Sequence, residues 1–438
     1  MASPLDEVVS AALLSPDLSV MAAGLIDSIG GRLSGTATGM RAERWAARWL
    51  REAGVDSVWF ETVEMPVWRR GELSIAVARP AALRGRKIVA LAYGYSPGIA
   101  ADSLPLIDIG RGDLELLRAM EAAADGAVLL TDVISPRVVE EAVAVGAAAL
   151  LRVSFEPGRL PQARVAPVEG APAPLPILAL SNEDGRWLRR LSAAGAVHLR
   201  LHVDATTAPG RAANVVGELR GSDERADGIV LLGAHLDAWD VGDGALDNGT
   251  GVLAVMAAAR ALAAAGERPR RTVRVVFFAG EELGLLGSRA YVAAHSESLT
   301  GIAAMLNMDM VGTAQGYGAT GHPEADTLFA RVAKQPALRR LVLSGEVDHG
   351  GGPGSDHQPF LLAGVPTIYV RTSLPPDAVR WYHNAGDTLE KIDLDAIRGS
   401  AAAAAAVAWE LADSPGRPLL HLSPEETQQL IERLGWLN

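Results

Sequence analysis

Four compact apolar segments in the second half of the chain constrain its fold more than any other feature. They are rich in Val, Ile and Leu, which is typical of strands that are covered on both faces. An Ala-rich segment with helical spacing, ending at Gly266, lies between the first two. This alternation predicts an α/β domain with a mostly parallel central sheet and helices on both faces. The four segments are residues 228–234, 271–280, 301–308 and 365–371.

The region from about residue 95 to residue 208 has a different pattern. Strand-like segments are separated there by short helices and by a Pro-rich stretch, residues 156–176. We therefore expect a smaller α/β domain, residues 95–208, inserted into a discontinuous larger domain, residues 1–94 and 209–438. The strand-like segments of the insertion are residues 104–110, 126–133, 147–154, 175–181 and 197–203; before it, residues 40–54 predict a helix and residues 55–68 and 86–94 predict strands.

Composition limits the class of protein. A chain of 438 residues is too long for one simple core, so two domains are expected. Its formal net charge of −12, with no basic stripe, argues against nucleic acid as a partner. The sequence contains no Cys, no stretch resembling a signal peptide and no stretch long enough to span a bilayer. We therefore expect a cytoplasmic protein with no membrane partner.

Acidic and imidazole side chains follow the four predicted strands of the larger domain. In an open α/β sheet, ligands bind at the carboxyl ends of the strands. Carboxylates and imidazoles delivered to one edge of a sheet are what a metal centre requires. The residues are His235 and Asp237 after the first strand, Glu281 and Glu282 after the second, Asp309 after the third, and His383 beyond the fourth.

The stretch "GAHLDAWDVGDGALDNGTG", residues 233–251, carries one His among four Asp. Its acids recur every third or fourth residue, which does not fit an EF-hand calcium loop, and a solvated loop would not explain His235. Imidazole beside carboxylate favours zinc, with cobalt or manganese as substitutes. Asp237 could accept the second ring N–H of His235, and the carboxylate of Asp247 could bridge two ions.

The adjacent pair Glu281–Glu282 follows an apolar strand. Two neighbouring carboxylates repel each other unless a positive charge nearby offsets the repulsion. The economical interpretation makes one a metal ligand and the other a base acting on metal-activated water. The alternative is a helix that begins with acids at its positive end.

Five segments carry a resemblance: residues 233–251, "VVFFAGEELGLLGSRAY", "LNMDMVG", "GPGSDHQPFLLAGVPTI" and "WYHNAGDT". In order and rough interval they resemble the di-zinc exopeptidase family, which includes bacterial leucyl aminopeptidases, glutamate carboxypeptidases and glutaminyl cyclases. The carboxypeptidase Q (plasma glutamate carboxypeptidase) group is the most similar, although Asn248 stands where that group often has a carboxylate. The resemblance implies the phosphorylase/hydrolase-like fold of zinc exopeptidases. By position, the insertion resembles a protease-associated domain.

The resemblance also implies a role for each site residue. Two zinc ions per chain would be bound, and Glu281 would be the general base that serves the attacking water. Asp237 would orient a ligand, and Tyr382 is a candidate for oxyanion stabilisation. The implied zinc ligands are His235, Asp247 and Asp309 for one ion and Asp247, Glu282 and His383 for the other.

The function expected from the resemblance is hydrolysis of short peptides or dipeptides by a metal-dependent exopeptidase. A carboxypeptidase needs a cation for the substrate carboxylate, for which Arg371 and Arg380 are candidates, whereas an aminopeptidase needs carboxylates. His357 could face the cleft. Three alternatives remain open: aminopeptidase rather than carboxypeptidase or dipeptidase specificity, a single-zinc glutaminyl cyclase, and a non-catalytic binding protein. A homodimer is common among relatives with such insertions.

Two sequence patterns resemble serine-hydrolase motifs, but they support a serine hydrolase less well than the residues above support a metal centre. Gly94-x-Ser96-x-Gly98 has the form of a nucleophile elbow, but Pro97 lacks the N–H that the oxyanion hole needs. The consecutive Ser355, Asp356 and His357 resemble a triad only in sequence, and triad members meet in space.

Overall fold

A computed structural model describes residues 3–168, 171–223, 226 and 228–436. The chain divides into two compact units. The first comprises Met1–Val63, Arg211–Val379 and Asp387–Asn438, and the second comprises Glu64–Gly210 and Arg380–Gly386. The second unit contains one eight-stranded sheet, and the first unit contains the other except for residues 64–69 and 206–210 of two of its strands.

The sheet of the first unit is mixed: its centre is parallel, as the sequence predicted, and antiparallel strands flank this centre. Strands β12, β11, β13 and β16 are parallel neighbours, but β10 runs antiparallel to β12 and β14 runs antiparallel to β16. The link from β13 to β14 is too short for the crossover that a parallel strand requires, so the chain reverses direction there. In spatial order the strands are β1 (Ser57–Arg69), β10 (Thr206–Leu219), β12 (Thr272–Phe278), β11 (Ile229–His235), β13 (Ile302–Asn307), β16 (Thr367–Ser373), β14 (Thr313–Ala319) and β15 (Val347–Asp348).

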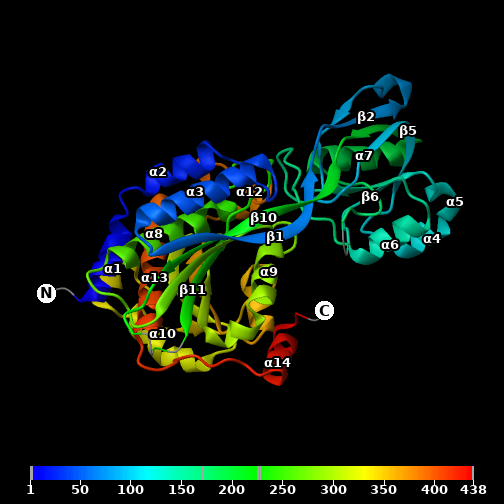
Figure 1. The fold of residues 1–438 in the computed structure, drawn as a ribbon. Helices are drawn as coiled ribbons and strands as arrows, with labels where there is room; N and C mark the ends of the chain where they lie inside the picture. Colours follow the sequence, from blue (N-terminus) through cyan, green and yellow to red (C-terminus); the bar gives the residue numbers. More distant parts are fainter. Residues whose placement is uncertain (1–2, 169–170, 224–225, 227, 437–438) are drawn as a thin grey trace. The chain divides into compact units, whose positions relative to one another are not determined.

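Helices cover both faces of this sheet, as predicted (Figure 1). Side chains of β11 alternate between two buried clusters, because successive residues of a strand point to opposite faces. Val230 belongs to the cluster that includes residues of α1 (Pro4–Leu14), α8 (Thr250–Ala264) and α13 (Leu394–Asp413), whereas Leu231 belongs to the cluster that includes Tyr291 and Phe360 on the other face. The other α-helices of five or more residues described in this unit are α2 (Leu18–Ala22), α3 (Ala37–Ala53), α9 (Leu286–Ala294), α10 (Asp326–Ala333), α11 (His357–Leu362) and α14 (Pro424–Leu434).

Among the described residues, no single helix is long and apolar enough to cross a membrane. Two consecutive N-terminal segments, Pro4–Leu14 and Leu18–Asp27, pass that test only together and are bent by 54°. Their apolar residues, among them Val8 and Leu25, are buried in the core of the first unit.

The sheet of the second unit includes the five strands expected for the insertion. The unit begins at residue 64 and not at 95, because β2 pairs with β9 and β4 pairs with β8. Residues 86–94, expected as one strand, form two. The spatial order is β3 (Lys87–Ile88), β2 (Leu73–Arg79), β9 (His198–Val203), β5 (Ile99–Asp108), β6 (Val128–Thr131), β7 (Ala149–Val153), β8 (Ile177–Leu180) and β4 (Ala90–Ala92). Helices include α4 (Leu114–Ala119), α5 (Glu121–Ala124), α6 (Pro136–Ala144) and α7 (Asn182–Ala194), and α12 (Ala378–Trp381) lies at the boundary.

Candidate metal centre

Three parallel strands bring the predicted site residues to one edge of the first unit's sheet. β11 lies between β12 and β13, and all three run in the same direction. In this register His235 is paired with Phe278, and Gly233 with Asn307. The residues that follow these strand ends therefore emerge at the same edge, where parallel strands present ligands.

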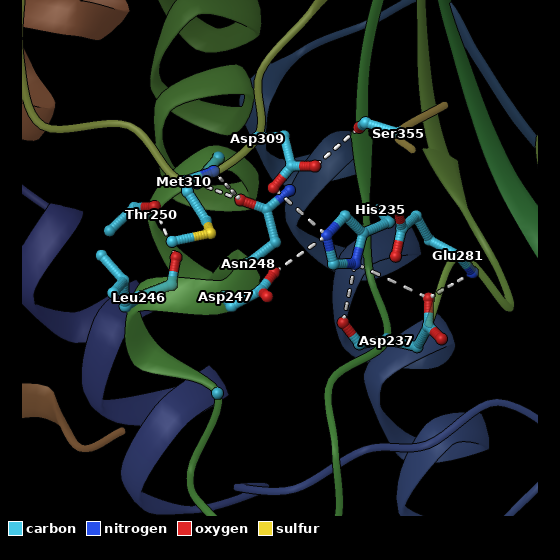
Figure 2. A network of polar contacts seen from close by, with 12 residues as sticks. His235, Asp237, Leu246, Asp247, Asn248, Thr250, Glu281, Asp309, Met310 and Ser355 are labelled. Carbon is cyan, nitrogen blue, oxygen red and sulfur yellow. Dashed lines mark hydrogen bonds and ion pairs between the residues drawn. The ribbon is translucent and has the colours of Figure 1, made fainter. Parts of the chain in front are cut away.

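The ring of His235 lies at the centre of this cluster (Figure 2). Its Nε2 is 3.1 Å from Oδ1 of Asp247 and 3.4 Å from Oδ1 of Asp309. Its Nδ1 is 3.0 Å from the main-chain oxygen of Asp237. A carbonyl oxygen only accepts hydrogen bonds, so this contact assigns a proton to Nδ1 and leaves the Nε2 lone pair directed at two carboxylates.

This arrangement fits a divalent cation. One ligand atom each of His235, Asp247 and Asp309 lies within 4.8 Å of the other two. A lone pair and two carboxylates facing one another are stable only with a positive charge among them. Burial disfavours protonation of His235, but Glu281, Asp309 and Asp247 outweigh it and raise the pKa of the imidazole well above its usual value. Nitrogen and carboxylate oxygen together are typical zinc ligands.

Asp237 binds the second ring nitrogen of His235 through its main chain and not, as the sequence suggested, through its carboxylate. The imidazole N–H donates to the main-chain carbonyl of Asp237, whereas the nearest carboxylate oxygen lies 3.8 Å from the ring nitrogen. The carboxylate instead accepts the main-chain N–H of Glu281, at 3.1 Å. Asp237 therefore fixes the ring through its backbone and the start of the Glu281–Glu282 segment through its side chain.

The Asp247 carboxylate lies close to two other candidate ligands, His235 and Glu282. It belongs to the cluster with His235, and an oxygen of Glu282 lies within 4.8 Å of one of its oxygens. Both side chains are almost fully buried. The neighbouring Asn248 ties this segment to the end of β13, because its amide donates to the carbonyl of Met308 and accepts from the N–H of Met310, each at 3.0 Å.

We predict that Asn248→Asp destabilises the protein by about 3 kcal/mol and weakens metal binding. A carboxylate cannot donate to the carbonyl of Met308, and the new charge would be buried next to Asp247. Urea unfolding and the bound-zinc content measure the two effects. Asn182→Asp is the matched control: it loses amide donations to Ser154 and Phe155 in the second unit, so it should lose stability but keep the metal content.

The side chain of Ser355 holds Asp309 in place. In the sequence, Ser355 stood out only as part of an apparent catalytic triad. The Ser355 hydroxyl donates to Oδ2 of Asp309 at 2.6 Å, and the Asn307 amide donates to the Ser355 oxygen at 2.8 Å. His357 instead contacts the carbonyl of Gly352, at 2.9 Å. These contacts give Ser355 the role of positioning Asp309, a candidate metal ligand.

Glu281 lies close to several other charged groups and is shielded from water. Burial raises the pKa of its carboxyl well above the usual value, and although His235 opposes this, Asp309, Glu282 and Asp356 add to it. A carboxylate with a raised pKa is a stronger base near neutral pH. Glu281 thus has the chemistry of a general base.

His383 belongs to the second unit, within the short segment Arg380–Gly386. Its Nδ1 lies 3.1 Å from the carbonyl oxygen of Ala163, and the N–H of Ala163 donates to the carbonyl of His383 at 2.7 Å. The ring of Tyr382 stacks on the imidazole, with centroids 3.6 Å apart. The hydrogen bond again places the ring proton on Nδ1, the tautomer in which Nε2 can bind a metal.

The candidate substrate contacts have their own partners. Arg371 lies on β16 opposite Gly316. The N–H of Gly350, the hydroxyl of Tyr369 and the charge of Arg371 lower the pKa of Asp348. Arg380, in the second unit, lies over the ring of Trp381, 5.2 Å from its centroid. The positive charge of Arg371 therefore already interacts with the carboxylate of Asp348.

Comparison with known proteins assigns the family. The model of peptidase family M28 matches residues 214–408, a range that contains the cluster of His235, Asp247 and Asp309. Residues 214–408 are an M28 peptidase domain. Carboxypeptidase Q of Mus musculus is 28% identical over 407 residues, which cover 89% of this chain and 84% of that protein. The predicted resemblance to the exopeptidase family, and the expectation of a metallopeptidase, are therefore confirmed.

Solved structures extend the likeness beyond the M28 domain. A peptidase M28 precursor from Shewanella amazonensis SB2B superposes with a TM-score of 0.80 at 27% identity, covering 96% of this chain and 99% of that one. A zinc aminopeptidase from Bacillus subtilis shares the fold, with a TM-score of 0.72 at 23% identity, covering 92% of this chain and 97% of that one. The likeness to these structures therefore extends over the regions of both sheets.

Proposed function

We propose that this protein is a zinc-dependent exopeptidase that hydrolyses short peptides. The observation that carries the proposal is the cluster of His235, Asp247 and Asp309 at the carboxyl edge of the sheet. The names of the relatives support it, since they are a carboxypeptidase and a zinc aminopeptidase.

We further propose that two ions are bound. His235, Asp247 and Asp309 would hold one ion. Asp247, Glu282 and His383 would hold the other, with the carboxylate of Asp247 shared. When bound, zinc supplies Lewis acidity, which polarises the peptide carbonyl and makes water easier to deprotonate.

Residues of the protein itself then transfer the proton and hold the participating groups in place. Glu281 takes a proton from the attacking water and delivers it to the nitrogen of the leaving amine, so that one carboxylate serves as base and then as acid. Asp237 keeps Glu281 in place through the hydrogen bond to its main-chain N–H. Ser355 keeps the Asp309 carboxylate turned toward His235.

A panel of short peptides tests this function. Di- and tripeptides with free ends, with an acetylated N-terminus or with an amidated C-terminus are assayed before and after chelation, and again after zinc is restored. We expect hydrolysis that is lost on chelation and regained with zinc. The blocked end that abolishes turnover identifies the terminus that the enzyme recognises.

The same experiment separates the alternatives. Cyclisation of an N-terminal Gln with one ion per chain would favour a glutaminyl cyclase. A protein that binds zinc but turns over none of the peptides would favour a binding protein. Undiminished hydrolysis after thorough chelation would rule out the metal-dependent mechanism.

A further inference from the structure

The loop that joins two of the proposed ligands is held by two buried charged residues from distant parts of the chain. Residues 236–246 connect His235, at the end of β11, to Asp247. Both ends of this loop are buried, with Leu236 and Ala245 in the core, whereas residues 240–243 are more exposed, so hydrogen bonds to its main chain add to the packing of its ends. Arg32, near the N-terminus, and Asp387, 140 residues beyond Asp247, bind that main chain.

Arg32 binds carbonyl groups at both ends of the loop. Its side chain is fully buried. Nε donates to the carbonyl of Leu236 at 2.7 Å, Nη1 to that of Asp243 at 2.9 Å and Nη2 to that of Gly244 at 2.8 Å. The planar guanidinium thus fixes the distance between the residue after His235 and the segment before Asp247.

Asp387 binds the N–H groups of the same loop. One carboxylate oxygen accepts the N–H of Leu246 at 2.6 Å, and the other accepts the N–H of Asp247 itself at 3.1 Å. Its main-chain carbonyl accepts the N–H of Asp243 at 2.9 Å. The side chain is 3% exposed, so these charge-assisted bonds form away from water.

The two residues complement each other. The guanidinium of Arg32 binds carbonyl oxygens, and the carboxylate of Asp387 binds N–H groups. The peptide dipoles of residues 243–247 therefore lie between opposite charges. Without such support, the carboxylates gathered around His235 would repel one another and spread whenever the metal is absent. A loop held from both sides keeps Asp247 beside His235 before the metal arrives.

We propose that Arg32 and Asp387 are positioning residues that preorganise the His235–Asp247 pair and thereby set the affinity of the M28 domain for its metal. The proposal rests on the metal site of the proposed function. It assigns to each residue a role in metal binding that acts through its hydrogen bonds to the main chain of the loop, in addition to the effect of its charge on Asp247.

Zinc titration of the metal-free protein tests the proposal. Asp387→Asn keeps one acceptor oxygen but presents an NH₂ group to the other N–H, so we expect zinc affinity to fall at least tenfold. Arg32→Lys keeps the charge but loses the planar fork, and a similar loss is expected. The matched control is Asp113→Asn in the second unit, where an Asp likewise accepts two consecutive main-chain N–H groups, of Glu115 and Leu116.

Two readouts separate metal positioning from stability alone. Zinc affinity within twofold of wild type in both variants, with only a lower melting temperature, would overturn the proposal. Hydrogen exchange of the metal-free wild-type protein needs no variant: the amides of Leu246 and Asp247 should stay protected, and rapid exchange there would also overturn it. Zinc binding is measured directly, so a failure to cleave peptides would count against the proposed function and not against this role.

Discussion

Glu281→Gln is expected to lower kcat by about 100- to 10,000-fold while the bound-zinc content stays at the wild-type level. Gln has the shape of Glu but cannot accept a proton from water. The side chain is not among the proposed ligands, and the main-chain N–H of residue 281 can still donate to Asp237. Steady-state kinetics on the best peptide of the panel, together with metal analysis of the same preparation, checks the result.

Two comparisons show whether the loss belongs to proton transfer. Glu281→Asp, which restores a carboxylate one methylene shorter, should recover part of kcat, whereas Glu282→Gln should lose metal as well as activity. If Glu281→Gln retained near wild-type turnover, the base would have to be another group and the assignment would be wrong.

The strands that carry the site could be predicted from the sequence because burial on both faces leaves a recognisable apolar run. β11, β12, β13 and β16 each coincide with such a run to within about two residues. β14 contains two Gly and β10 contains Pro209 and Gly210, so neither has the strand pattern. Those two strands make the sheet mixed, and their pairing depends on contacts between distant residues.

The ligand candidates could be predicted because metal chemistry restricts residue type. His235, Asp247 and Asp309 are the kinds of side chain that bind zinc; His235 and Asp309 lie at predicted strand ends, and Asp247 precedes the predicted helix. Arg32 and Asp387 left no such signal. Both bind main-chain atoms, which every residue carries, so nothing in the sequence of residues 236–247 identifies them as partners.

The metal-free protein is expected to become less stable as pH rises from about 4.5 to about 7.5, opposite to ordinary acid denaturation. Burial, aided by Asp237 and Asp309, raises the pKa of Asp356 to about 7, although His235 and Ser288 oppose it. Burial likewise raises the pKa of Asp387 to about 6. Each carboxyl stabilises the fold most fully below its unfolded pKa of about 4, and that stabilisation is lost as pH rises through the folded value.

His235 acts in the same direction, because a raised imidazole pKa gives stability that is present below about pH 6.5 and lost as pH rises through the folded pKa. For Asp387 alone, the rise of its pKa from the usual 3.8 to about 6 corresponds to about 3 kcal/mol. Bound zinc replaces these protons, so the stability gained on adding zinc should grow with pH. Urea unfolding at pH 4.5, 6.0 and 7.5, with and without chelator, measures both trends.

Asp356→Asn removes one titrating group and should flatten the metal-free trend. Metal-free stability that rises over this range would contradict the assignment of buried, protonated groups to the site.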